Sequence, residues 1–251
     1  MFMAKTIAVV NQKGGVGKTT TCINLTAALK ENHQRVLLID LDPQGNSTSG
    51  FGVEKTSAHS SYSLLMDSEP ISSCIRQTPY GDLIPSHKTL SGAEIELVSV
   101  EHRESVLKQT ISTVEDLYDY ILIDCPPSLS LLTVNALVAC SSVLIPVQCE
   151  YYALEGLSDL VFSLRAVKKN MNPSLEIEGI LLTMYDSRTS LSLQVTEEVK
   201  RFFPGKVFAS VIPRNVRLSE SPSFGMPVLS YDSSCKGADA YRRLAMELIR
   251  R

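Results

Sequence analysis

The sequence of 251 residues lacks the features of a membrane protein and of an oxidised, exported protein. Its longest apolar runs, such as residues 36–39, have the length of a strand and fall far short of the roughly 20 residues that a spanning helix needs. Its six cysteines form no C-x-x-C pair and no cysteine and histidine cluster with zinc spacing. The chain leads from Met1 directly into a strand pattern, so we expect no export signal. These absences predict a cytosolic protein with reduced thiols.

Internal repeats and low-complexity tracts are also absent, and the composition is ordinary. Hydrophobic residues make up 44% and charged residues 20% of the chain, as in a soluble globular protein. A chain of this length buries roughly 70–75% of the surface that it exposes when unfolded, so its core needs no disulfides or metals. We therefore expect a single domain over residues 1–251.

The charge is distributed unevenly along the chain. Residues 1–159 hold 10 Lys and Arg against 18 Asp and Glu, whereas residues 160–251 hold 14 against 9. A basic C-terminal third is typical of a protein that binds a polyanion there, although a chance asymmetry of a solvated surface gives the same count.

Strand-like apolar runs alternate with helix-like segments, which predicts an α/β fold with a mostly parallel central sheet covered by helices on both faces. We expect strands at residues 6–10, 35–40, 82–85, 120–124, 143–147, 177–184 and 207–211. We expect helices at residues 19–31, 101–117, 131–139, 154–170, 191–203 and 237–250. Residues 46–63 are rich in Ser, Thr and Gly and are interpreted as a loop.

A glycine-rich loop joins the first predicted strand to the first predicted helix. It reads Lys13-Gly14-Gly15-Val16-Gly17-Lys18-Thr19-Thr20. The P-loop pattern G-x-x-x-x-G-K-[ST] requires a glycine where this chain has Gln12, so the loop is a deviant form. Its chemistry is intact, because glycines allow backbone N–H groups to surround phosphate oxygens at the positive end of a helix. Lys18 would bind the β- and γ-phosphates and Thr19 would complete the Mg²⁺ shell, so we predict an ATPase.

Carboxylates follow two of the predicted strands. Asp40 and Asp42 alternate at the end of one strand and Asp124 ends another, which brings all three to the carboxyl edge of the sheet, where ligands bind. Asp124 is the residue expected to hold Mg²⁺ through water. One acidic strand end can simply cap a helix or a loop, but two of them behind a phosphate loop favour the functional interpretation.

Lys13 carries a resemblance to a known class. A second lysine at the start of the loop is not needed to bind phosphates within one subunit, and it resembles the signature lysine of the ParA, MinD and nitrogenase iron protein class. Over essentially the whole chain the sequence resembles Soj-type ParA DNA-partitioning ATPases. The resemblance rests on residues 11–20, 42–46, 91–97, 146–157 and 212–220. The last two of these segments are what distinguish ParA from the wider class.

The resemblance implies roles for individual residues. Lys13 would cross a dimer interface to the nucleotide of the partner subunit and supply transition-state charge, so that ATP joins two subunits. Asp42 would position the attacking water and Asp40 would support the metal or its hydration shell. Pro213 and Asn215 would line the adenine pocket, unless they only form a turn.

The resemblance also implies partners and a location. Arg188 and Arg217 would bind non-specific DNA through its phosphates once the dimer forms, although a lone arginine is more often an ordinary surface residue. A ParB- or Spo0J-like protein would stimulate the ATP-dependent homodimer. The implied location is the bacterial cytoplasm, in association with the nucleoid and without a membrane.

Three other interpretations stay open at this stage. A MinD-like membrane ATPase would carry an amphipathic C-terminal helix, and Ala238, Tyr241, Leu244, Ala245, Leu248 and Ile249 do form an apolar stripe flanked by arginines. The protein could instead use ATP only as a conformational clamp, as a reductase or non-enzymatic relative would. Cys125 could hold an iron–sulfur cluster between subunits, although nothing in the sequence favours this specifically.

Overall fold

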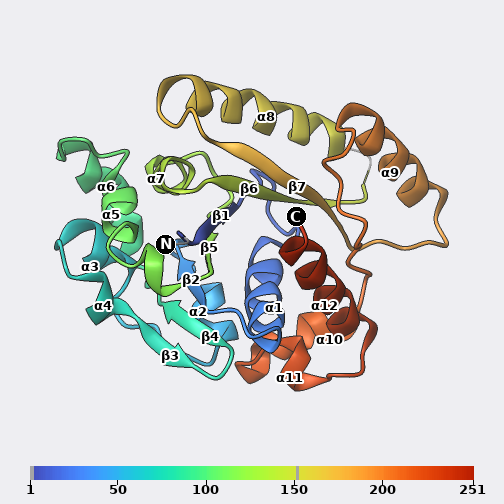
Figure 1. Ribbon diagram of the computed structural model, residues 1–251, viewed down its shortest axis with the longest axis horizontal. Coiled ribbons are helices and arrows are strands. Elements are labelled where there is room, and N and C mark those ends of the chain that lie inside the picture. The colour runs from blue at the N-terminus through green and yellow to red at the C-terminus, as the bar shows by residue number, and fades with distance from the viewer. Residues whose placement is uncertain (1–2, 151–152) are drawn as a thin grey trace.

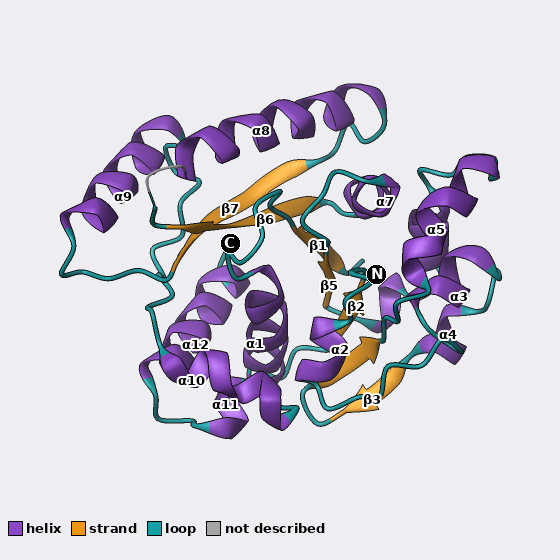
Figure 2. Ribbon diagram, turned by 180° about the vertical axis from the view of Figure 1, so that it is seen from behind, coloured by secondary structure: helices purple, strands orange, loops and turns teal. Residues whose placement is uncertain are grey.

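The described residues, 3–150 and 153–251 of a computed structural model, form a seven-stranded sheet between two layers of helices (Figures 1 and 2). The strands are β1 (Lys5–Val9), β2 (Val36–Asp40), β3 (Arg76–Thr78), β4 (Gly81–Ile84), β5 (Tyr120–Asp124), β6 (Ser142–Gln148) and β7 (Glu176–Thr183). Their order across the sheet is β3-β4-β2-β5-β1-β6-β7, and every neighbouring pair is parallel except β3 and β4. The predicted fold class is thereby confirmed.

Helices connect the strands. They are α1 (Lys18–Glu31), α2 (Asn46–Gly50), α3 (Ser61–Met66), α4 (Ile71–Cys74), α5 (Leu90–Glu96), α6 (Val106–Ile111), α7 (Leu131–Ala139), α8 (Ala153–Asn170), α9 (Ser190–Phe202), α10 (Val216–Glu220), α11 (Val228–Tyr231) and α12 (Lys236–Ile249). Three short 3₁₀ helices, η1 (Leu97–Ser99), η2 (Glu115–Leu117) and η3 (Ser221–Phe224), complete the described elements.

Alternating strand residues supply two separate cores, one on each face of the sheet. Along β5, for example, Leu122 belongs to the core that includes residues of α1, α11 and α12, whereas Ile121 and Ile123 belong to the core that includes residues of α3 and of α5 to α8. Because both faces are covered, the central strands are apolar throughout rather than alternately polar.

The helix that follows the glycine-rich loop is buried on nearly every side. Thr21 to Leu29 of α1 are all buried, since the helix lies between the sheet and α12 (Figure 1). The hydroxyl groups of Thr21 and Tyr241 lie 3.3 Å apart across the contact of α1 with α12. The C-terminal helix therefore holds the loop-bearing helix against the sheet.

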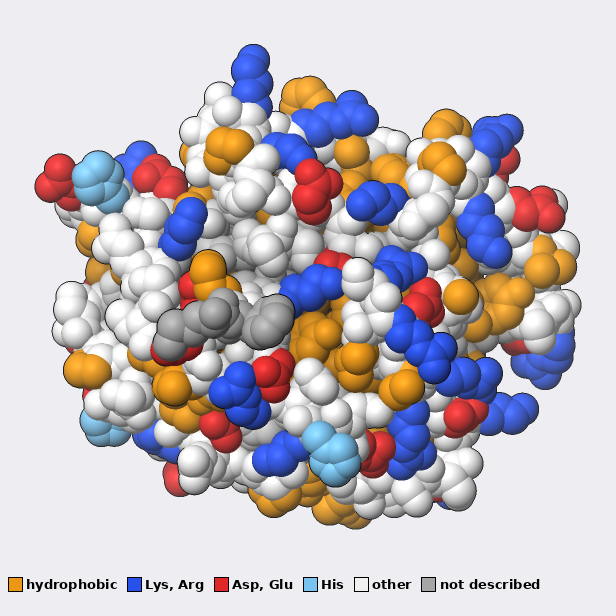
Figure 3. Space-filling view, in the orientation of Figure 1, with side chains coloured by type: hydrophobic (Ala, Val, Ile, Leu, Met, Phe, Trp, Pro, Cys, Tyr) orange, Lys and Arg blue, Asp and Glu red, His pale blue; other side chains and the backbone are white. Residues whose placement is uncertain are grey.

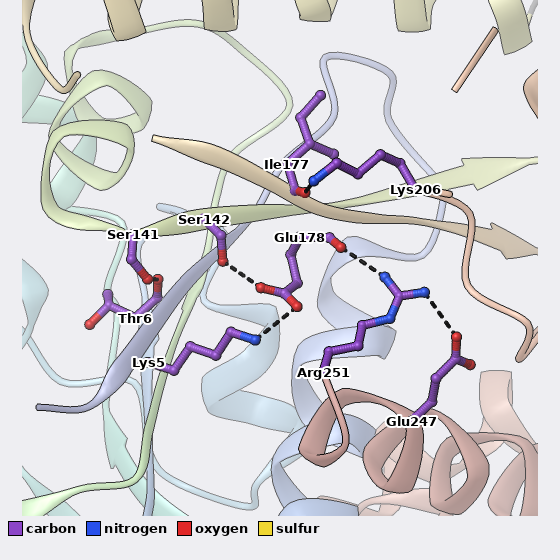
Figure 4. A network of polar contacts seen from close by, with 9 residues as sticks. All are labelled: Lys5, Thr6, Ser141, Ser142, Ile177, Glu178, Lys206, Glu247 and Arg251. Carbon is purple, nitrogen blue, oxygen red and sulfur yellow. Dashed lines mark hydrogen bonds and ion pairs between the residues drawn. The ribbon is translucent and has the colours of Figure 1, made fainter. Parts of the chain in front are cut away.

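A polar network ties the end of α12 to the edge of the sheet (Figure 4). The Glu178 carboxylate in β7 accepts hydrogen bonds from Lys5 Nζ at 2.8 Å and from Ser142 Oγ at 2.9 Å, which joins β1, β6 and β7. The Arg251 guanidinium donates to the Glu178 carbonyl at 2.8 Å and to Glu247 Oε1 at 3.0 Å. This end of α12 is thereby fixed to β7.

Three sequence predictions about elements are wrong. The strand predicted at residues 207–211 is reduced to an isolated bridge, because the N–H groups of Ala209 and Ser210 donate to the Glu247 carboxylate at 2.8 Å each. The helix predicted at residues 101–117 is split into the shorter α6 and η2. The loop predicted at residues 46–63 contains α2 and the start of α3.

Candidate nucleotide-binding site

The glycine-rich loop lies at the carboxyl end of β1, where the backbone turns sharply into α1. Gly15 and Gly17 have φ angles of +75° and +92°, a left-handed region in which a side chain is strained. A Cβ atom added to Gly14 or Gly15 would meet no other atom within 4 Å, so the rim of the loop is open. From the sheet side, Thr183 Oγ1 donates to the carbonyl of Val16 at 2.8 Å and fixes the loop.

Lys18 is the first residue of α1 and is almost fully buried beneath the loop. Its exposed fraction is 7%, and its Nζ donates to the carbonyl of Lys13 at 3.1 Å. Burial lowers the pKa of Lys18, whereas the negative charge of Asp124 acts in the opposite direction. The loop therefore encloses a cation whose position is fixed before any ligand arrives.

Asp40 and Asp124 lie side by side at the ends of β2 and β5, as residues paired in the parallel register. Both side chains are fully buried. Asp40 Oδ2 accepts hydrogen bonds from the backbone N–H of Thr48 at 2.8 Å and from its hydroxyl at 2.7 Å, and Asp40 Oδ1 accepts one from the N–H of Asp42 at 3.3 Å. Asp40 is therefore saturated by the protein itself and holds α2 in place.

The Asp124 carboxylate is saturated only in part. Its Oδ2 accepts a hydrogen bond from Ser47 Oγ at 2.8 Å, while its buried Oδ1 has no hydrogen-bond partner among the described residues. Burial raises the pKa of Asp124 to about 6, and the Ser47 and Thr19 hydroxyl groups act against that increase. Burial, together with the charge of Asp124, raises the pKa of Asp40 to about 7.

A magnesium ion with its water shell fits this arrangement. The unpartnered oxygen of Asp124 and the adjacent Thr19 hydroxyl are the hard oxygen donors that Mg²⁺ prefers. In the described part of the chain, no group of three or more His, Cys, Asp and Glu residues forms a metal cage. This donor set matches an ion that is held by few protein ligands and completes its shell with water and phosphate oxygens.

Asp42 lies just beyond the end of β2 with an exposed fraction of 7%. Its Oδ1 accepts a hydrogen bond from the N–H of Gln44 at 2.9 Å, and its backbone carbonyl accepts one from Ser86 Oγ at 2.7 Å. Asp42 is therefore held in place near Lys18, whose pKa responds to its charge.

A cavity of about 430 Å³ adjoins the loop and contains both residues predicted to bind adenine. Its lining includes Gly17, Thr20, Met184, Pro213 and Asn215. Asn215 Oδ1 accepts a hydrogen bond from the N–H of Arg217 at 2.8 Å and caps α10. Its side-chain NH₂ group has no hydrogen-bond partner among the described residues and is available to a base edge. A larger groove of about 670 Å³ between α8 and α9 contains none of the loop residues.

The Lys13 side chain pairs with Glu150, which lies two residues beyond the end of β6. Its Nζ lies 2.8 Å from Glu150 Oε2, and the two side chains are 42% and 44% exposed. The predicted trans lysine is therefore on the surface of the subunit and engaged in an ion pair within it.

Of the two arginines predicted to bind DNA, Arg188 lies in the turn before α9 and Arg217 lies in α10. The N–H of Arg214 donates to the carbonyl of Tyr185 at 3.2 Å, which joins the loop before Arg217 to the loop before Arg188. Arg188 is 86% exposed and pairs with Asp186 at 2.7 Å, and hydrogen bonds from Arg188 lower the pKa of Asp186. Arg217 pairs with Glu220 at 2.9 Å and Asp232 at 3.2 Å, so both arginines are partly neutralised within the subunit.

Positive side chains also gather over α12. Figure 3 shows Lys and Arg side chains concentrated over this part of the molecule, with fewer acidic side chains between them. Arg242, Arg243, Arg250 and Arg251 of this region line a shallow groove with Ala209, Met246 and Glu247.

Five of the six residues in the apolar stripe of α12 are buried, and the sixth, Ile249, is partly buried against the same core. Ala238, Tyr241, Leu244, Ala245 and Leu248 have exposed fractions of 0% or 1%. Among the residues that the structure describes, no helix is long and apolar enough to cross a bilayer. Cys125 is likewise only 1% exposed, and burial raises the pKa of its thiol.

Several residues of the site were missed by the sequence analysis. Ser47 and Thr48 hold the carboxylates of Asp124 and Asp40, and Glu150 holds Lys13. The only sequence signal for the first two was the segment Gly45-Asn46-Ser47-Thr48, which is also typical of a loop. Glu150 lies in one of the segments that carry the resemblance, but nothing in the sequence pairs it with Lys13.

Comparisons with known proteins find relatives along nearly the whole chain. The model of a family described as AAA domain matches residues 4–177. The chain is 55% identical over 249 residues to the sporulation initiation inhibitor protein Soj of Bacillus subtilis, with 98% of each chain covered. It is 50% identical over 252 residues to the chromosome partitioning protein ParA of Myxococcus xanthus, covering 99% of this chain and 89% of the relative.

A solved structure extends the comparison to a bound nucleotide. Cobyrinic acid a,c-diamide synthase from Mycobacterium smegmatis, crystallised with ADP and magnesium, has a TM-score of 0.87 and 38% identity to this chain. The match covers 99% of this chain and 95% of that chain.

Proposed function

Because the chain belongs to the ParA and Soj family of chromosome-partitioning ATPases, we propose that it is a DNA-partitioning ATPase that dimerises on ATP and binds DNA without sequence preference. The proposed unit is a single domain over residues 1–251. The proposed location is the bacterial cytoplasm, on the nucleoid, with a ParB- or Spo0J-like protein as the partner that stimulates ATP hydrolysis.

The observation that carries the proposal is the buried pair of Lys18 and Asp124 beneath an open glycine loop. Lys18 is only 7% exposed, and the carboxylate of Asp124 is fully buried with one unpartnered oxygen. Burying these charged groups costs folding free energy unless a ligand binds to them. ATP with Mg²⁺ would satisfy both groups, since the phosphates would accept hydrogen bonds from Lys18 and the free oxygen of Asp124 would accept one from a water on the metal ion.

Within this proposal each residue has a distinct task. Mg²⁺, when bound, neutralises charge on the β- and γ-phosphates. The backbone of Gly14 to Gly17 and the side chain of Lys18 orient the phosphates, and Thr19 and Asp124 hold the metal's shell. Asp42 positions the attacking water, because it is the carboxylate near Lys18 that is neither fully buried nor saturated by α2.

The base and the second subunit complete the site. Pro213 and Asn215 bind the adenine in the cavity beside Gly17, where the free NH₂ of Asn215 can donate to a ring nitrogen. Lys13 leaves Glu150 and reaches the nucleotide of the partner subunit, where its charge stabilises the transition state.

DNA binding follows from dimerisation. One subunit offers Arg188 and Arg217, both partly neutralised by acidic neighbours, and this is too little charge to hold DNA at physiological salt. Two subunits double the number of phosphate contacts, so affinity rises and its salt dependence becomes steeper. Contacts to phosphates alone carry no base readout.

The deciding experiment measures ATP turnover with and without DNA and a ParB-like partner. The proposal requires slow basal hydrolysis that the two together increase. If neither DNA nor the ParB-like partner changes the rate of hydrolysis, the protein would be an ATPase without the proposed partitioning function.

A MinD-like membrane ATPase is the competing function. The burial of the α12 stripe counts against it, because the residues that would enter a membrane already pack against α1 and the sheet. Co-sedimentation with liposomes and with DNA in the presence of ATP separates the two functions, and binding to liposomes alone would favour the MinD-like one.

A further inference from the structure

Glu150 is held in a fixed position opposite Lys13. It lies two residues after β6, the strand beside β1, and its Oε2 is 2.8 Å from Lys13 Nζ. The side-chain amide of Gln148 donates to the other carboxylate oxygen, Oε1, and the N–H of Glu150 donates to the carbonyl of Gln148 at 2.8 Å. The carboxylate therefore has a donor on each side.

The backbone of Lys13 is fixed as well. Its N–H donates to Asn11 Oδ1 at 3.0 Å, and its carbonyl accepts a hydrogen bond from Lys18 Nζ at 3.1 Å. Asn11 Nδ2 in turn donates to the carbonyl of Pro146 in β6 at 2.8 Å. Since both the N–H and the carbonyl of Lys13 are hydrogen-bonded, a change in the position of its charge must come from the side chain alone.

We propose that Glu150 is a positioning residue that keeps the Lys13 side chain within its own subunit until a second ATP-bound copy of this chain arrives. The inference rests on the proposed role of Lys13 across the dimer interface. In the proposed dimer Lys13 leaves Glu150 to reach the nucleotide of the partner subunit, so the ion pair stabilises the separate subunit only. The pair thereby shifts the monomer–dimer equilibrium toward the monomer.

The exposure of the pair sets the size of this effect. Side chains that are 42% and 44% exposed form an ion pair that water and salt screen. Exposed pairs of this kind change an equilibrium by about fivefold at most. Such a weak restraint suits a switch, because the phosphates of a bound nucleotide offer Lys13 more negative charge than Glu150 does.

Glu150→Gln is the variant that tests the restraint, because it removes the charge and keeps the shape. Dimerisation is measured by sedimentation velocity at increasing protein concentration, with a non-hydrolysable ATP analogue and Mg²⁺. We expect the variant to dimerise about two- to fivefold more tightly than the wild type. The advantage should shrink as salt is raised to about 0.5 M, where the Debye length is only a few ångströms.

The matched control is Glu176→Gln, which breaks another exposed ion pair, that of Glu176 with Lys168. Glu176 is the first residue of β7, so this pair lies at the other edge of the parallel sheet from Glu150, which follows the end of β6. The control variant should dimerise as the wild type does. A Glu150→Gln protein with unchanged dimerisation would overturn the proposal, because the carboxylate would then have no effect on the dimer. Weaker dimerisation would also overturn it, because the carboxylate would then stabilise the dimer.

Lys13→Ala separates this inference from the proposed function. If Lys13 acts in trans, the single variant binds the ATP analogue as a monomer, and Lys13→Ala with Glu150→Gln does not recover the dimer. A double variant that does recover it would show that Glu150 acts by repelling the partner's phosphates and not by holding Lys13. A Lys13→Ala protein that dimerises normally would instead contradict the trans role itself.

Discussion

Asp124→Asn should stabilise the ligand-free protein at pH 8 and remove its response to Mg²⁺ and ATP. The carboxylate is fully buried, one of its oxygens has no hydrogen-bond partner among the described residues, and burial raises its pKa to about 6. An unfolded chain has an Asp pKa of about 3.9. An asparagine has nearly the same shape and can still accept the hydrogen bond from Ser47, but it is never charged.

The sign of the pH dependence follows from the raised pKa. Between about pH 4 and pH 6 the folded protein keeps a proton on Asp124 that the unfolded chain has already released. The associated stability is fully present below about pH 4 and is lost as the pH rises through about 6. A difference of about two pKa units corresponds to about 3 kcal/mol. This is an upper bound, because the nearby Asp40, whose pKa is raised to about 7, loses its proton in the same range and the two contributions do not add.

Urea denaturation followed by circular dichroism, at pH 4 and pH 8 with EDTA, measures the difference. The variant and the wild type should have similar free energies of unfolding at pH 4, and the variant should be more stable by about 1–3 kcal/mol at pH 8. This corresponds to a melting temperature about 2–10 °C higher. Asp159→Asn, a change of an exposed carboxylate in α8, is the control and should show no such pH dependence.

Two results would contradict this prediction. The first is a wild type that is as stable as the variant at pH 8 or more so, because burial of the Asp124 charge would then not destabilise the fold. The second is an equal increase in melting temperature of both proteins with Mg²⁺ and ATP, because Asp124 would then not contribute to the metal site.

Three further predictions concern the proposed function. Lys18→Ala should weaken ATP binding by at least about 100-fold in calorimetry, because charge-assisted hydrogen bonds contribute about 1.5–3 kcal/mol each, and wild-type affinity would contradict the phosphate role. Asp42→Ala should bind ATP but lose at least about 100-fold in turnover and leave a long-lived dimer, whereas normal turnover would transfer the water-positioning role to another residue. Arg217→Ala, and equally Arg188→Ala, should weaken binding to all DNA sequences alike and reduce the salt slope by about one or two units per dimer. Sequence-selective binding, or equally tight binding without ATP, would contradict a phosphate-based interface.

Apolar runs made the core strands predictable. Residues 120–124 form β5 and residues 131–139 form α7 with the predicted bounds, because continuous apolar runs of these lengths fit a buried strand and a buried helix. The phosphate loop was predictable for a related reason, since its glycines have no structural use at a strand–helix junction except where φ is positive or a ligand lies close.

Elements that depend on a distant partner were not predictable in the same way. Residues 207–211 have the composition of a strand, but the carboxylate of Glu247, far along the chain in α12, takes the N–H groups that a strand would need. Residues 46–50 have the composition of a loop, yet they form α2 because Asp40 accepts two hydrogen bonds from Thr48. Local propensity is overridden in both segments by a buried or half-buried carboxylate.

The short helix α2 makes the metal side and the base side of the site one structural unit. At its start, Ser47 holds Asp124, the carboxylate proposed to bind the shell of Mg²⁺. Just beyond its end, Gly52 packs against Gly225, which follows η3, and both have left-handed φ angles of +68° and +64°. A Cβ atom on Gly52 would lie only 2.8 Å from the carbonyl oxygen of Gly225, so no other residue allows the two backbones to approach this closely. The helix η3 follows directly after α10, and Asn215 caps α10 at the base cavity. A displacement of Asp124 that moves α2 therefore also moves the elements that form that cavity.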